Sequence, residues 1–124
     1  MHKTVPAAFA LVALTACAPA GAASRVATTA SLFASALHRQ DGSAACALLT
    51  DAARSSLEND SGQACDKAVL AVKSDPSGVQ VQVWGDEAEA RASHDTLFLD
   101  RTAKGWRVRA AGCKPQGKDV PYQC

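Results

Sequence analysis

Three kinds of residue in this chain could do chemistry: a histidine beside a carboxylate, a second histidine, and five cysteines. His94 directly precedes Asp95, and imidazole paired with carboxylate serves general acid–base catalysis. Adjacent residues of a strand point to opposite faces, so we interpret this pair as polar residues at a strand edge. His38 falls near the end of a predicted helix, where a cationic side chain stabilises the terminus. We therefore assign no catalytic residue.

The sequence carries none of the short motifs that identify common active sites. There is no Gly-rich phosphate loop, no G-x-S-x-G and no H-E-x-x-H. No C-x-x-C occurs, and even the two nearest cysteines, Cys113 and Cys124, are too far apart in sequence for a metal-binding pair. We expect neither a metal nor a cofactor.

Residues 1–16 have the pattern of an export signal. His2 and Lys3 give a basic tip, and an apolar run over 5–14, broken only by Pro6, leads to small residues. The run is too short to cross a bilayer, which takes about 20 apolar residues. The sequence therefore predicts export from the cytosol.

The tetrad Leu-Thr-Ala-Cys at 14–17 resembles the lipobox of bacterial lipoproteins. In that family the chain is cut before the cysteine, whose thiol then carries a diacylglycerol. The resemblance implies that Cys17 is lipidated, that 17–23 form a tether, and that the domain sits on the extracytoplasmic face of the cell membrane. The alternative is ordinary secretion, because small-x-small cleavage sites within 20–23 would discard Cys17 and release the domain.

The four cysteines that remain after Cys17 form an even set, which in a small exported domain predicts disulfide bonds. Four cysteines allow three connectivities. We predict Cys46–Cys65 and Cys113–Cys124, because each pair closes a short local loop within one half of the chain. Each bond should stabilise the fold by about 3 kcal/mol.

The charge balance argues against a general binder of nucleic acid or anionic surfaces. Removing residues 1–16 takes away one lysine, which leaves twelve Lys and Arg against twelve Asp and Glu. A nucleic-acid-binding domain would need a basic excess.

Helical periodicity runs through the first half of the chain. A continuous apolar stripe from Val26 to Leu37 predicts a helix with Ser24 as its N-cap that stops near Gln40. Three shorter helices are predicted over 44–49, 52–58 and 63–72, the first of them capped by Ser43.

After Pro76 the hydrophobic period changes to two, which predicts strands. We expect strands over 79–84 and 87–92, then a hairpin over 95–113 that turns at Lys104-Gly105. In the last strand the alternation predicts one inner face made of Trp106, Val108 and Ala110.

Helices followed by a meander of about four antiparallel strands predict an α+β fold with the helices on one face of the sheet. This layout, with a sheet that ends in Gly105-Trp106-Arg107-Val108, resembles the NTF2-like (SnoaL-like) cone fold over residues 24–124. More narrowly, it is similar to small actinobacterial lipoproteins of that type. The resemblance implies a curved sheet around a pocket.

Two aromatic residues, Trp84 and Phe98, are expected on the polar side of the sheet with Arg107 and Arg109. An aromatic residue among charges on an open sheet face is a candidate binding surface for a protein partner. The alternative is a solvated face with cross-strand ion pairs.

These patterns lead to two functional hypotheses. The first is a membrane-anchored, non-catalytic binding module of the cell envelope, which binds a protein or another envelope component. The second is an NTF2-like pocket protein: an isomerase or hydrolase that acts on a small apolar ligand, or a carrier of one. A deep apolar pocket that holds His38, His94 or Asp95 would favour the enzyme, and a filled cone would count against it.

Overall fold

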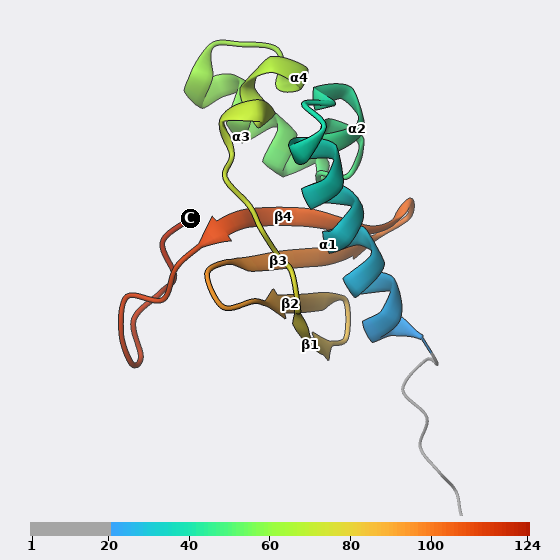
Figure 1. The fold of residues 1–124 in the computed structure, drawn as a ribbon, viewed down its shortest axis with the longest axis vertical. Helices are drawn as coiled ribbons and strands as arrows, with labels where there is room; N and C mark the ends of the chain where they lie inside the picture. Colours follow the sequence, from blue (N-terminus) through green and yellow to red (C-terminus); the bar gives the residue numbers. More distant parts are fainter. Residues whose placement is uncertain (1–20) are drawn as a thin grey trace, which may run out of the picture.

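The computed structural model describes residues 21–124, which form helices followed by an antiparallel sheet (Figure 1). This confirms the predicted α+β class. The predicted signal peptide and Cys17 lie outside the described residues. The elements in chain order are α1 (Ala22–His38), α2 (Gly42–Ala47), α3 (Asp51–Ser61), α4 (Cys65–Ala68), the 3₁₀ helix η1 (Val69–Ala71), β1 (Gln80–Trp84), β2 (Glu87–Arg91), β3 (Thr96–Thr102) and β4 (Gly105–Cys113).

The long helix α1 crosses one face of the sheet (Figure 1). Its buried side is the predicted apolar stripe, in which Val26, Ala30 and Phe33 have no exposed surface. The helix begins at Ala22 after Gly21, not at Ser24, and its last residue is His38. Ser24 therefore lies inside the first turn, where its carbonyl accepts a hydrogen bond from the Thr28 hydroxyl at 2.9 Å.

Two of the short helices, α2 and α3, begin at side-chain caps. Asp41, not Ser43, caps α2 by accepting a hydrogen bond from the Ala44 amide at 3.0 Å. Thr50 caps α3 in the same way through the Ala53 amide at 3.0 Å. Both side chains satisfy amide groups that a helix start otherwise leaves without partners.

The helix expected over 63–72 is much shorter than predicted. Only Cys65–Ala68 is α-helical, and η1 follows it directly. Val72 is already extended, because the chain here leaves the helices and runs across the sheet to reach β1 (Figure 1).

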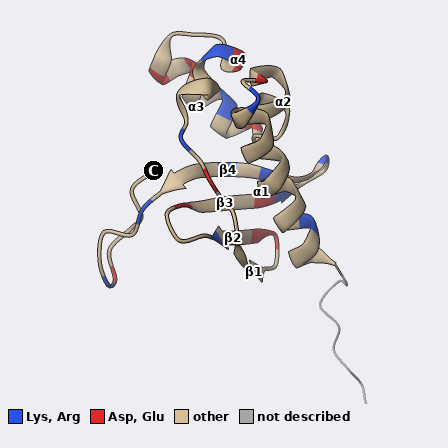
Figure 2. Ribbon diagram, in the orientation of Figure 1, with Lys and Arg blue, Asp and Glu red and all other residues tan. Residues whose placement is uncertain are grey.

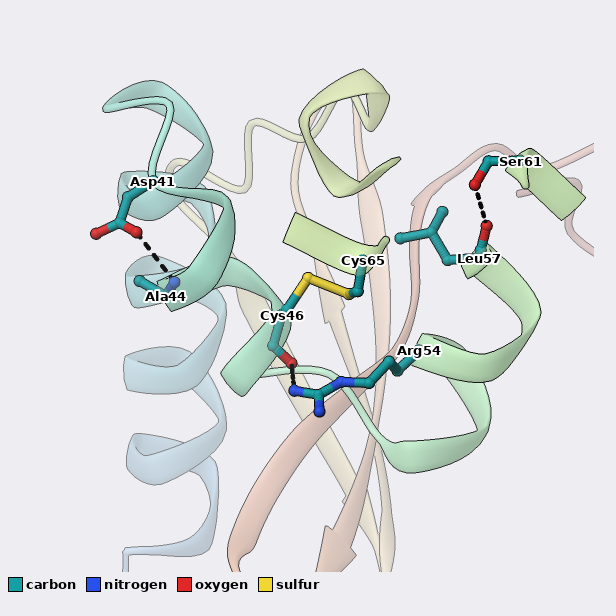
Figure 3. The surroundings of a disulfide bond; sticks show 7 residues. All are labelled: Asp41, Ala44, Cys46, Arg54, Leu57, Ser61 and Cys65. Carbon is teal, nitrogen blue, oxygen red and sulfur yellow. Dashed lines mark hydrogen bonds between the residues drawn. A yellow bond between two sulfur atoms is a disulfide. The ribbon is translucent and has the colours of Figure 1, made fainter. Parts of the chain in front are cut away.

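Both predicted disulfide bonds are present. Cys46–Cys65 joins α2 to α4 (Figure 3), and Cys113–Cys124 joins the end of β4 to residue 124. Both sulfurs of the first bond belong to buried residues. The bond therefore holds together two helices of six and four residues, each too short to be stable alone.

The sheet has the order β1-β2-β3-β4, with every neighbouring pair antiparallel. Its inner face supplies Ala88, Ala90, Leu97, Leu99 and Val108 to the core under α1. The sheet is not strongly curled, whereas the resemblance to a cone implied a curved one. Its first two strands have five residues each and pair without register shifts, so they carry none of the bulges that bend a sheet.

The pairing of β3 with β4 contains two irregularities. Leu99 lies opposite Val108, but Phe98 lies opposite Ala110, so β4 has one extra residue at this point. The extra residue moves Ala110 to the face of Phe98, and Ala111 packs against the core instead. The prediction that Ala110 shares the inner face is therefore wrong, because alternation with period two cannot reveal a bulge.

The two edges of the sheet differ. The edge formed by β4 pairs with the chain between α2 and α3: the Thr50 amide donates to the Val108 carbonyl at 2.9 Å, and the Val108 amide donates to the Leu48 carbonyl at 2.7 Å. Among residues 21–124, β1 has no strand partner other than β2. One edge is therefore covered and the other is open.

Candidate functional site

The outer face of the sheet, opposite α1, carries the predicted binding surface. The register places Trp84, Glu87, Asp100 and Arg107 in one row across the four strands. Trp84 is 56% exposed, an unusual state for so large an apolar side chain. Acidic and basic residues are interspersed along the strands (Figure 2), and this row itself holds Glu87 and Asp100 beside Arg107, so its charge is mixed.

Phe98 lies in the next row and is partly covered. The Tyr122 ring meets it edge-on, with centroids 5.2 Å apart, and the Arg109 guanidinium lies 5.6 Å from its centroid. Arg109 also pairs with Asp100, at 3.1 Å from Nε to Oδ1. The structure thus brings Phe98, Arg107 and Arg109 to the face that carries Trp84.

Tyr122 belongs to the same face and was missed by the sequence reasoning, as was the burial of Glu89. Glu89 is only 6% exposed, and its Oε1 accepts hydrogen bonds from Arg91 at 3.0 and 3.2 Å and from the Tyr122 hydroxyl at 3.3 Å. The hydrogen bond with Glu89 raises the pKa of Arg91 above its ordinary value. The segment that ends at Cys124 therefore covers part of the outer face.

A second region is an open cleft of about 1170 Å³ beside the C-terminal end of α1. Its wall includes His38, His94 and Asp95, the residues considered above for acid–base catalysis. His94 and Asp95 lie in the turn between β2 and β3, not within a strand. Both can therefore line one cleft, and the expectation that strand geometry would separate them is wrong.

Asp95 is already engaged within this cleft. The residue is 4% exposed, and its Oδ2 accepts hydrogen bonds from the Ser74 hydroxyl and from the Asp75 amide, the latter at 3.0 Å. Neither His38 nor His94, which are both exposed, hydrogen-bonds to Asp95 within the described chain. This carboxylate fastens the segment before β1 to the β2–β3 turn, and it does not form a catalytic dyad with a histidine.

The described part of the chain offers no metal centre. Over residues 21–124 no group of three or more His, Cys, Asp or Glu side chains is placed to hold an ion. The four cysteines of this region are paired in disulfides, so none of them is a free thiolate ligand.

A third region is a smaller open cleft of about 400 Å³ between α1, α3 and β4. Its wall is mostly apolar, with Phe33, Leu49, Leu57 and Val69 among its residues and Arg109 at the β4 side. Its volume lies in the range of small-molecule sites, which are typically apolar with a few polar groups. No histidine lines this cleft.

Comparison with known proteins gives no further guide, since no family model, curated protein or solved structure matches the chain. Within residues 21–124 no helix has the length and apolar character needed to span a bilayer.

Proposed function

We propose that this chain is an extracytoplasmic lipoprotein, anchored at the cell membrane by a lipid on Cys17, whose domain is a non-catalytic binding module of the envelope. The two disulfide bonds are the observation that carries the location, because such bonds persist in oxidising compartments and are rare in the cytosol. The lipobox resemblance supplies the anchor, and the absence of charge excess in residues 21–124 favours a protein partner over nucleic acid.

The outer sheet face is the binding surface in this proposal. Trp84 is its most exposed large apolar residue, and Phe98 and Arg109 pack together beside the row that Trp84 begins. Trp, Tyr and Arg are the residue types that most often dominate binding energy at protein interfaces. The partner that fits this face is an envelope protein with a mixed polar and apolar surface.

The proposal keeps the resemblance to NTF2-like domains, because this chain has helices first and then an antiparallel sheet. The inner side of this sheet is filled: Phe33, Leu97 and Leu99 are completely buried between α1 and the strands. A filled inner side supports the binding module over the pocket enzyme.

The apolar cleft beside α3 supports a second candidate, a carrier of a small apolar ligand. Its walls supply apolar contact without an acid–base pair, as a carrier requires. Mass spectrometry of solvent extracts from protein purified out of its own membranes decides the matter. A stoichiometric apolar compound would support the carrier, and its absence would refute it.

The first prediction concerns the anchor. Replacing Cys17 by alanine should move the protein from the membrane fraction to the medium, because the thiol that carries the lipid is lost. Immunoblots of both fractions measure the change. Thr15→Ala is the matched control, since it keeps a small residue in the tetrad and should leave the protein at the membrane. Unchanged retention of the Cys17→Ala protein would refute the anchor.

The second prediction concerns the binding surface. Trp84→Ala should reduce recovery of the partner at least about ten-fold in cross-linking from intact cells, as expected for a central interface tryptophan. The residue is exposed, so the melting temperature should stay nearly unchanged. The control is Arg25→Ala on the exposed side of α1, which should keep full recovery. Equal recovery from both variants would exclude Trp84 from the interface.

A further inference from the structure

The open edge strand β1 lacks the features by which proteins prevent edge-to-edge pairing. Its sequence, Gln-Val-Gln-Val-Trp, contains no charge, proline or glycine, and its pairing with β2 has no bulge. Natural edge strands are usually protected by one of these features or covered by other chain. The opposite edge follows this rule, because β4 is bulged, carries arginines and pairs with the segment around Thr50. An unprotected edge is a template for another strand.

We propose that β1 pairs antiparallel with β1 of a second copy of this chain, which joins two four-stranded sheets into one continuous sheet. A two-fold axis perpendicular to the sheet keeps the inner faces of both copies on the same side. Two residues that lie opposite each other must then both be even-numbered or both be odd-numbered, because side chains alternate between the faces of a strand. The register that uses all five residues of β1 places Gln82 on the axis, opposite Gln82 of the second copy.

This register is self-complementary. Val81 meets Val83 of the second copy on the inner side, and Trp84 meets Gln80 of the second copy on the outer side. Both valines are half-buried and already pack against the core, so the contact extends the apolar layer under α1. Trp84, 56% exposed in the single chain, gains a neighbour. A symmetric interface needs this kind of self-matching patch.

Charge favours a second copy over a charged peptide as the occupant. The strand itself is uncharged, so no like charges meet across the axis. Residues 21–124 hold twelve basic and twelve acidic residues, so two copies do not repel each other overall. In Figure 1 β1 is the outermost strand of the sheet.

The pairing does not rest on the proposed binding function. It would, however, make the two outer faces one surface, with both Trp84 side chains near its centre. Loss of the dimer and loss of a partner are separable, since Gln82 lies at the axis while the Phe98 cluster lies two strands away.

A cysteine at the axis tests the register in the full-length chain, in cells. Gln82→Cys should give a covalent dimer on non-reducing gels, with a bond between the two introduced cysteines identified by mass spectrometry. Gln80→Cys is the matched control: it is exposed on the same strand, but it lies opposite Trp84 and should form no covalent dimer on the same gel. Equal cross-linking of both variants, or a monomeric Gln82→Cys protein, would overturn the register.

A measurement without new cysteines tests the pairing itself. The purified full-length protein in detergent should sediment as a dimer that dissociates on dilution. Gln82→Lys places two positive charges directly opposite each other and should raise the dissociation constant about five-fold or more. Gln82→Thr, uncharged and suited to a strand, should leave it unchanged. A wild-type chain that stays monomeric at every concentration overturns the proposal. This holds also if the β1 edge then binds an extended peptide in place of a second copy.

Discussion

Replacing Cys46 and Cys65 together by alanine is expected to lower the free energy of unfolding by about 3 kcal/mol. The bond joins α2 to α4, whose six and four residues cannot hold helical structure by themselves. Figure 3 shows that Arg54 of α3 also lies beside this disulfide, and its guanidinium donates a hydrogen bond to the Cys46 carbonyl at 3.1 Å. Loss of the bond should therefore loosen all three short helices. Denaturant unfolding followed by circular dichroism measures the change.

The second disulfide provides the internal control. Adding reductant to the protein that lacks Cys46 and Cys65 reports the contribution of Cys113–Cys124 alone. That bond fixes the segment with Tyr122 against the sheet, so its loss should expose Phe98 while leaving the helical signal intact. If the double replacement leaves the unfolding midpoint unchanged, the helical layer does not depend on the bond.

Gly42→Ala should strongly destabilise the helical layer, with a cost of about 3 kcal/mol. A Cβ atom built on Gly42 would lie 1.7 Å from the carbonyl oxygen of Asp66, far inside van der Waals contact. The obstacle is backbone, so no side chain can rotate away from it. Helices α2 and α4 would have to move apart, and the Cys46–Cys65 bond resists that movement. Thermal unfolding with Ser43→Ala as control measures the effect.

The Gly42→Ala replacement and the loss of the Cys46–Cys65 bond should be energetically coupled. In a chain that already lacks the disulfide, α2 and α4 can separate, and Gly42→Ala should then cost less than it does in the wild type. A double-mutant cycle gives the coupling energy directly. Equal costs in both backgrounds would show that the close approach of Gly42 to Asp66 is independent of the bond.

The sheet could be predicted well because its signals are local. The valines of β1 alternate with polar residues. The turn predicted at Lys104-Gly105 lies one residue earlier, at Ala103-Lys104, and Gly105, with a φ of 102°, begins β4. The disulfide pairing followed from short loops. The α+β class then followed from the order of the two kinds of periodicity.

The features that were missed depend on contacts between distant residues. Ala110 changed face because β4 contains bulges, and Glu89 is buried because Tyr122, more than thirty positions later, covers it. The helix over 63–72 ended early because the chain must leave for β1. For the candidate binding surface, the sequence predicted on which face of the sheet Trp84 and Phe98 lie. It did not predict that Tyr122 packs edge-on against Phe98.

The bridge between the connection from α2 to α3 and strand β4 has a consequence for how the molecule comes apart. Thr50 and Val108 are far apart in the chain, yet each gives its amide to a hydrogen bond across this junction. The same Thr50 caps α3, so peeling β4 away would also remove the start of that helix. Fraying of either half therefore disrupts the other. We expect a single cooperative unit, with no stage in which the helices persist after the sheet has gone.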